Sequence, residues 1–168
     1  NKSTSTLTIS CDGMMPHYSA NNQPWNQYNS EVETIILKSG IENISNNAFY
    51  GMKNLKNIVI PSTVKSIGGS AFNGCFAMAK IDLPNSITKI ENMAFYRCTN
   101  MLDITFDKNI NSIGKYAFGY AWDMNRNPAI ISNQVKIYGY EDTTAEEYAL
   151  NNKIKFIPLN SITSTNTT

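Results

Sequence analysis

Side chains that could act as a nucleophile, a base or a metal ligand are few in this chain. Its 168 residues include one histidine, His17, and three cysteines, Cys11, Cys75 and Cys98. A Ser-His-Asp or Cys-His scheme would have to use His17, because such catalysis needs an imidazole beside the nucleophile. His17 lies in a stretch rich in turn-forming residues, which favours a surface or structural histidine.

Neither the cysteines nor the carboxylates form a recognisable site. The cysteine count is odd and no Cys-x-x-Cys pair occurs, so the sequence indicates neither a disulfide framework nor a zinc centre. Asp103 and Asp107 could share one side of an element as a calcium or general-acid pair, but such a pair usually lies on a solvated face. There is no glycine-rich phosphate loop. We therefore predict that the protein is not an enzyme, has no catalytic residue, and binds no metal or cofactor.

The composition argues against nucleic acid and membranes as partners. The formal net charge is +1 and charged residues make up 16% of the chain, so no broad field favours nucleic acid or an anionic surface. No apolar run approaches the roughly 18 residues that a membrane-spanning helix needs. The hydrophobic content of 42% is enough for a continuous core, and the length suits one domain.

The dipeptide Ala-Phe recurs at a constant spacing and predicts the architecture. A fixed period between about 20 and 50 residues is typical of a solenoid, in which each coil buries its apolar face against the next. The four copies are 23 residues apart: Ala48-Phe49, Ala71-Phe72, Ala94-Phe95 and Ala117-Phe118.

The other apolar positions predict the elements of one coil. Ile58 and Ile60 have the two-residue period of a strand with one buried face. The stretch from Ala71 to Met78 has helical spacing, which predicts a short helix or 3-10 turn on the outer side. Val64 and Ile67 lie between them and are expected to turn the chain. The predicted fold class is an α/β-type solenoid of about five coils, with short stacked strands on one face, helical turns on the other and atypical end caps.

Cys75 and Cys98 occupy the same column of the repeat, and two interpretations of them stay open. As small apolar side chains, they would be free thiols that fill neighbouring interior positions. Coils about 4.8 Å apart along a strand ladder would also bring them within reach of a disulfide.

The repeat and the composition of the ends divide the chain into segments. The ends are rich in serine and threonine and cannot bury enough apolar surface to become ordered, so we interpret them as linker remnants. We expect a disordered tail at 1–6, an N-terminal cap and first coil at 7–34, repeat coils at 35–134 with a loop insertion near 123–133, a C-terminal cap coil at 135–160 and a disordered tail at 161–168.

Both caps have atypical sequences, because one face of a terminal coil meets water. At the N-terminal side, Trp25 and Tyr28 stand where the next coil has Ala-Phe. At the C-terminal side, residues 142–152 predict a short helix followed by a final strand at 154–158. A capping box would start this helix, either Thr143 with Glu146 or Thr144 with Glu147.

The column pattern resembles that of the BspA-like leucine-rich repeats. Residues 58–78 follow the pattern Ile-x-Ile-Pro-x-x-Val-x-x-Ile-Gly-x-x-Ala-Phe-x-x-Cys-x-x-Leu closely, with Met78 at its last position. Residues 7–16 and 145–156 are similar to the opening and closing segments of such proteins. The resemblance implies a leucine-rich repeat fold in a secreted or cell-surface protein of a host-associated microbe. It also implies an adhesion-type role, with a host matrix or surface protein as the partner.

Residues that alternate with the buried strand positions make the candidate binding face. Five strands about 4.8 Å apart would form a ledge wide enough for a protein interface. A plain solvated sheet face is the alternative. The candidate residues are Thr34, Ile36, Lys38, Asn57, Val59, Lys80, Asp82, Asp103, Thr105, Asp107, Lys136 and Tyr138.

Two other functions stay open. The aromatic residues Tyr50, Tyr96, Tyr120 and Trp122 could stack against sugars in a carbohydrate-binding module, although tyrosines that pack on their own coil explain them equally well. A passive structural spacer within a larger surface protein is the third possibility.

Overall fold

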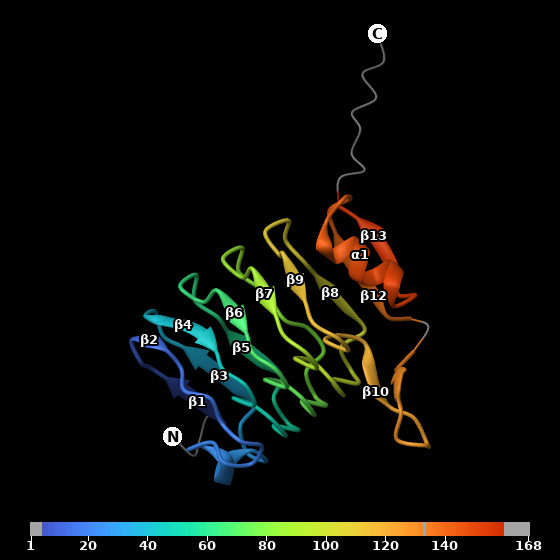
Figure 1. Ribbon diagram of the computed structural model, residues 1–168. Helices are drawn as coiled ribbons and strands as arrows, with labels where there is room; N and C mark the ends of the chain where they lie inside the picture. The colour runs from blue at the N-terminus through green and yellow to red at the C-terminus, as the bar shows by residue number, and fades with distance from the viewer. Residues whose placement is uncertain (1–4, 133, 160–168) are drawn as a thin grey trace.

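Successive coils of the chain stack along one axis, with parallel strands on two sides and tight turns at one end of each coil (Figure 1). The computed structural model describes residues 5–132 and 134–159. Paired strands of neighbouring repeat coils are 23 residues apart in the sequence, as where Thr34 lies beside Asn57 and Asn43 beside Ser66. One Ala-Phe period is therefore one coil.

The first side of the stack, called the strand face below, consists of two three-stranded parallel sheets. Their strands are short because each coil contributes only three or four residues to this side. One sheet has the order β1-β3-β5 and the other β13-β12-β8. The strands are β1 (Thr6–Ile9), β3 (Thr34–Leu37), β5 (Asn57–Val59), β8 (Asp103–Thr105), β12 (Lys136–Gly139) and β13 (Lys155–Pro158).

The strand face is interrupted between β5 and β8. We expected a strand around Lys80 and Asp82, and this expectation is wrong: residues 79–84 form no strand. Among the described residues, no backbone hydrogen bond joins residues 80–83 to either neighbouring coil. Asp82 and Pro84 suit a strand poorly, since Asp is depleted in strands and Pro lacks the N–H donor. Ile81 is still buried, so the coil keeps its place in the core.

The second side is a five-stranded parallel sheet that the sequence did not predict. Positions such as Val64 to Ile67 were expected only to turn the chain, but Ser66 and Ile67 pair with the coils before and after them. Ile44, Ile67 and Ile90 stand in register and are fully buried. The sheet has the order β2 (Gly13–Met14), β4 (Ile41–Ile44), β6 (Ser66–Ile67), β7 (Lys89–Ile90) and β9 (Ser112–Ile113).

The Ala-Phe stretches form tight turns, and the expected outer helices are absent from residues 46–120. These segments, 46–51, 69–74, 92–97 and 115–120, are called the turn ladder below. Within each segment, some N–H groups close i to i+3 turns, as from Ala48 N to Ser45 O at 3.2 Å. Others donate to the next coil, as from Phe49 N to Ala71 O at 2.8 Å.

Left-handed residues explain why the turn ladder is not helical. An α-helix needs consecutive residues in the right-handed region. Here each segment contains two residues with positive φ, which reverse the backbone so that alternate N–H groups point toward the following coil. The first of them are Asn47, Ser70, Met93 and Tyr116, with φ of 56°, 54°, 59° and 57°, and the second are Gly51, Gly74, Arg97 and Gly119.

The core is a continuous column of stacked aromatic rings. Trp25 stacks on Phe49 with ring centroids 5.8 Å apart, and the Phe49–Phe72 and Phe72–Phe95 centroids are each 5.3 Å apart. Phe118 is 1% exposed and belongs to the same hydrophobic cluster. The alanines of the four pairs are fully buried. The predicted Ala-Phe columns are therefore confirmed, and Trp25 takes the place of the phenylalanine in the atypical first coil.

Side chains of the caps complete the hydrogen bonds at the ends of the turn ladder. At the N-terminal end, Trp25 Nε1 donates to Ala48 O at 2.8 Å, and Asn29 Nδ2 donates to Tyr50 O at 3.2 Å. At the C-terminal end, Phe118 N donates to the Tyr148 hydroxyl at 3.1 Å. A buried backbone N–H or C=O group without a hydrogen-bond partner destabilises the fold. These contacts supply the partners that a further coil would otherwise provide.

The C-terminal cap contains α1 (Thr144–Asn151), as the sequence predicted, but the predicted capping box does not form. The Thr143 hydroxyl donates to Tyr140 O, while Glu146 accepts from the backbone N–H of Asp142. The N-terminal cap contains a 3-10 helix, Asn26–Tyr28. Among the described residues, no helix is long and apolar enough to cross a bilayer.

The insertion is a β-hairpin and not an irregular loop. It pairs β10 (Tyr120–Trp122) with β11 (Pro128–Ile130) in antiparallel fashion and projects from the stack (Figure 1). Asp123 Oδ1 accepts from the backbone N–H groups of Asn125 and Asn127 and holds the turn. The expected tails fall mostly outside the described residues, except that Thr6 belongs to β1.

Candidate functional site

The strand face places most of the predicted residues on its outer surface. In β3 and β5, Thr34 lies beside Asn57 and Ile36 beside Val59. Asn57 and Val59 are exposed, while Thr34 and Ile36 are half-buried. Lys38 is exposed just beyond the end of β3. This half of the face is therefore mainly uncharged, with an apolar pair at its centre.

The other half of the strand face carries charge. Lys136 lies beside Asp103, and Tyr138 lies beside Thr105. Asp103 and Thr105 are exposed, and Lys136 and Tyr138 are half-buried. Opposite charges in register on neighbouring strands attract each other, although Lys136 and Asp103 are not within ion-pair distance.

A recess lies where the strand face is interrupted. It has a volume of about 350 Å³. Three predicted residues line it, namely Asp82, Thr105 and Asp107. Lys80 is exposed in the same coil but does not line the recess. The interruption thus separates the mainly uncharged half of the face from the charged half. The recess is lined by the interrupted coil and by the coils of the charged half, with no residue of β3 or β5.

Six further residues line the recess and were not predicted as part of the binding face; two of them, Ile81 and Phe106, are buried core residues. Leu83 and Asn85 come from the interrupted coil, and Tyr140 and Leu159 come from the C-terminal cap. The last two follow β12 and β13 and continue the outward alternation of Tyr138 and of Ile157. That alternation was the available signal, but the sequence does not reveal that the two cap residues reach a hollow.

The carboxylates of the recess lack a cationic partner. The ion pairs found among residues 5–132 and 134–159 are Lys56–Glu33 and Lys89–Glu91, and neither touches the recess. Asp107 Oδ1 accepts from the backbone N–H of Asn109 at 3.0 Å. Asp82 and Asp107 therefore leave negative charge at the hollow.

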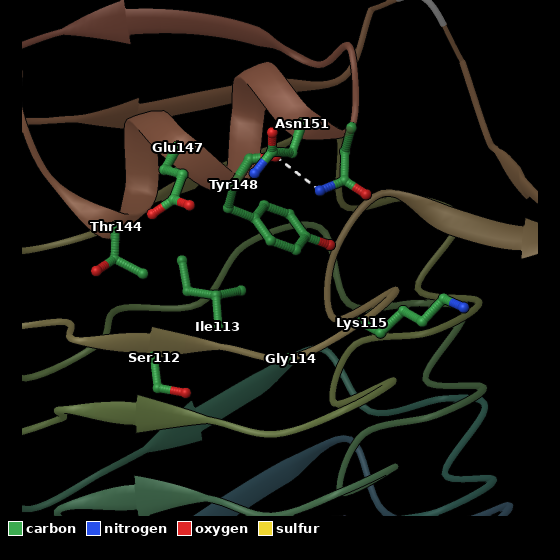
Figure 2. Close-up of a pocket in the computed structure, with 9 residues that line it drawn as sticks. Ser112, Ile113, Gly114, Lys115, Thr144, Glu147, Tyr148 and Asn151 are labelled. Atoms are coloured by element: carbon green, nitrogen blue, oxygen red, sulfur yellow. Dashed lines mark hydrogen bonds between the residues drawn. The ribbon is translucent and has the colours of Figure 1, made fainter.

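A second groove lies between β9 and α1, and its residues serve the structure. Figure 2 shows the two walls of this groove. One wall is α1, with Thr144, Glu147, Tyr148 and Asn151, and the other is formed by residues 112–115. The Tyr148 hydroxyl both accepts from Phe118 N and donates to Phe118 O. Burial raises the pKa of Tyr148 to about 12, so the phenol stays neutral and holds the cap.

Cys75 and Cys98 are free and buried in the stack, which decides between the two interpretations left open for them. Cys75 and Cys98 form no disulfide. The Cys75 thiol donates to Phe49 O at 3.3 Å, and the Cys98 thiol donates to Phe72 O at 3.1 Å. Burial raises the pKa of Cys98 to about 12, and a thiol that stays protonated is a poor nucleophile. Both cysteines therefore fill interior positions.

The other candidate chemistry does not converge on a site. His17 lies on the surface. Within the part of the chain that the structure describes, no group of three or more His, Cys, Asp or Glu side chains could hold a metal ion.

The aromatic residues proposed for sugar stacking are not a common exposed platform. Tyr96 is 1% exposed and meets Trp122 edge-on, with ring centroids 5.3 Å apart. Tyr120 is half-buried, and its hydroxyl donates to Asn152 Oδ1. Tyr50 is also half-buried, and only Trp122 is largely exposed. For Tyr96 the structure therefore favours packing against the stack over sugar stacking, because Trp122 of the hairpin covers its ring.

Stacked coils with parallel strands and a 23-residue register define a leucine-rich repeat protein. Residues 27–152 match the model of the BspA type leucine-rich repeat region in six copies. The chain belongs to this family, as the column pattern predicted.

Solved structures with the same fold come from bacteria. A leucine-rich repeat protein of T. pallidum aligns with 80% of this chain and 59% of its own, at 18% identity and a TM-score of 0.58. A leucine-rich repeat protein of Eubacterium ventriosum aligns with 82% of this chain and 40% of its own, at 24% identity and a TM-score of 0.59. The pneumococcal vaccine antigen PcpA aligns with 92% of this chain and 41% of its own, at 16% identity and a TM-score of 0.62.

This chain therefore spans less than two thirds of the length of these three proteins. At these identities the likeness concerns the fold. Comparison with curated proteins gave no match.

Proposed function

We propose that this chain is a non-enzymatic protein-binding module of the cell surface or the secreted space, and that it acts in adhesion through the strand face. The observation that carries the proposal is the strand face itself, where an exposed apolar position, Val59, lies within a register-matched array of polar and charged side chains. Exposed apolar surface rimmed by polar groups is typical of protein interfaces.

The size of the strand face supports the proposal. Strands of neighbouring coils lie about 4.8 Å apart, so the coils from β3 to β13 provide a ledge of roughly 25 Å. That width suits a standard interface of about 800 Å² per partner. The similarity to a vaccine antigen of pneumococcus supports an extracellular location, and the scattered chemistry of His17 and the cysteines supports a role without catalysis.

A charge-reversal experiment tests the proposal. The paired change Lys80→Glu with Asp103→Lys inverts charges on the strand face, where Lys80 and Asp103 are both exposed. We expect it to weaken binding to surfaces coated with purified extracellular matrix proteins by about tenfold, since like charges placed across an interface are costly. Biolayer interferometry measures the affinity.

The second sheet offers a matched control. Glu42 and Lys65 are exposed in neighbouring coils, and their exchange, Glu42→Lys with Lys65→Glu, should leave the affinity unchanged. Equal affinities for both double variants and the wild type would contradict binding through the strand face. Absence of binding to every surface would favour the alternative of a passive spacer.

A further inference from the structure

We propose that the recess at residues 82–85 accepts a lysine or arginine side chain from an extended segment of a partner protein. The inference rests on the proposed function, because it assigns a chemistry to one point of the strand face. Four properties of the recess carry it: the backbone groups at its rim, its charge, its apolar walls and the lack of a metal-binding set.

The recess has backbone groups at its rim as well as carboxylates. Residues 80–83 make no backbone hydrogen bond to the described residues of the coils on either side, and Asp82 and Leu83 line the recess. Backbone N–H and C=O groups need hydrogen-bond partners, and a bound peptide segment can supply them. The interruption therefore places backbone donors and acceptors beside the hollow.

The charge of the recess selects a cation. Asp82 and Asp107 line it without an ion-pair partner among the described residues. Asp103, on the same face, instead lies in register with Lys136. An arginine or lysine of a partner would give Asp82 and Asp107 the charge-assisted hydrogen bonds that the chain does not provide.

The walls of the recess select a side chain with an apolar stem. Leu83 and Leu159 line it together with Tyr140. Lysine and arginine bury their methylene groups against such surface while the charged head reaches polar groups, and a tyrosine ring attracts a cation over its face.

A bare metal ion fits the recess less well than a side chain. No set of three or more metal-ligating side chains occurs among residues 5–132 and 134–159. The oxygen-rich shell of calcium needs six to eight ligands, and leucines supply none. An organic cation needs only one or two carboxylates and gains from the apolar walls.

Nuclear magnetic resonance titration of the full chain tests the proposal with a defined probe. The probe is a blocked five-residue peptide, threonine-valine-lysine-valine-threonine, at millimolar concentration. We expect amide shifts confined to residues 80–85, 105–107 and 140. The same peptide with acetylated lysine should bind about tenfold more weakly, because acetylation removes the charge. Equal binding of the two peptides, shifts elsewhere or no shifts would overturn the proposal.

Variants and salts separate the recess from its surroundings. The double change Asp82→Asn with Asp107→Asn should weaken peptide binding by about tenfold, while Asp103→Asn should not. Both carboxylates are on the surface side of the coils, so the variants should fold, which circular dichroism verifies. Calcium chloride should leave residues 80–85 unshifted; calcium shifts at these residues would identify a metal site and refute the proposal.

The failure of this inference is distinct from failure of the proposed function. If the Asp82 and Asp107 variant binds matrix protein normally while the Lys80 and Asp103 variant does not, the proposed role of the recess is refuted, and the proposed binding through the strand face is supported. If neither variant changes binding, both proposals fail.

Discussion

Truncation of one ring in the aromatic column should destabilise the whole stack. Phe72 is fully buried, and its ring lies between those of Phe49 and Phe95, with both centroids 5.3 Å away. Phe72→Ala removes the ring and leaves a cavity that two rigid neighbours cannot close. Such truncations cost about 3–5 kcal/mol, and each aromatic pair adds about 0.5–1.5 kcal/mol beyond its buried area.

We therefore expect a loss of free energy of unfolding near the top of that range, about 4–5 kcal/mol. Natural domains have only about 5–15 kcal/mol in total, so the variant should remain folded but be visibly weakened. With a denaturant dependence of about 2 kcal/mol/M, the midpoint in urea should fall by roughly 2 M. Tyr50→Ala is the matched control, because Tyr50 follows the buried Phe49 in its own coil and is only half-buried. It should cost about 1 kcal/mol.

Urea titration with tryptophan fluorescence is the assay, since the two tryptophans report on different parts of the stack. Trp25 stacks on Phe49 in the first coil, and Trp122 of the hairpin contacts Tyr96 edge-on. In Phe72→Ala both signals should move to lower urea together, because the core is one column. Equal midpoints for the Phe72 and Tyr50 variants would refute the assignment of buried columns. A shift confined to one tryptophan would refute the continuity of the core.

Three other predictions concern the cap, the close contacts of the coils and the buried thiol. Tyr148→Phe removes the hydroxyl that pairs with Phe118 N and O and should cost about 1–3 kcal/mol by urea titration; no change would show that water replaces the hydroxyl. Gly114→Ala puts a Cβ 2.4 Å from the backbone nitrogen of Asn92 and should destabilise the protein by at least about 1–3 kcal/mol. Gly69→Ala, whose Cβ would have its nearest atom at 3.5 Å, should be nearly neutral. A larger loss of stability for Gly69→Ala than for Gly114→Ala would contradict the close approach of the coils at Gly114. Burial raises the pKa of Cys98 from 9.0 to about 12. The stabilisation linked to the protonated thiol is therefore complete below pH 9 and is lost as the pH rises toward 12. A Cys98→Ala variant should show a smaller fall of the urea midpoint at alkaline pH than the wild type, and an identical fall would contradict the buried thiol.

The apolar columns could be predicted from the sequence because each one repeats. The Ala-Phe pairs recur every 23 residues. Both positions are buried in every coil, which explains why the same two residue types occur in all four copies. The five-stranded sheet could not be predicted in this way. Its strands, such as Ser66–Ile67, are mostly two residues long, and a two-residue strand has no period to detect.

Local backbone conformation explains the error on the outer turns. The spacing from Ala71 to Met78 fits a helix, but Ser70 and Gly74 adopt positive φ and break the run. Serine and methionine carry no sequence signal for a left-handed conformation, since these positions are set by the hydrogen bonds to the next coil. The apolar spacing was therefore identified correctly. The backbone conformation of these residues depends on hydrogen bonds to the next coil, which the local sequence does not reveal.

The candidate site was predictable only as a surface. Alternation along β3, β5, β8 and β12 identified the outward residues. The recess depends on two facts that lie outside any one strand: Lys80–Leu83 do not pair, and Tyr140 and Leu159 approach from a distant part of the chain. A break in pairing and a long-range approach leave no local pattern.

The direction of the hydrogen bonds in the turn ladder makes the two ends of the molecule chemically unlike. The side chains of Trp25 and Asn29 only donate hydrogen bonds, to carbonyl oxygens, at one end, whereas the Tyr148 hydroxyl at the other end also accepts one from the Phe118 amide. Duplication of an interior coil would preserve every partner and lengthen the module by about 4.8 Å. Placing the N-terminal cap at the C-terminal end would set donor against donor, since the Trp25 N–H would meet the Phe118 N–H. The architecture therefore tolerates growth in whole windings but fixes which cap closes which end.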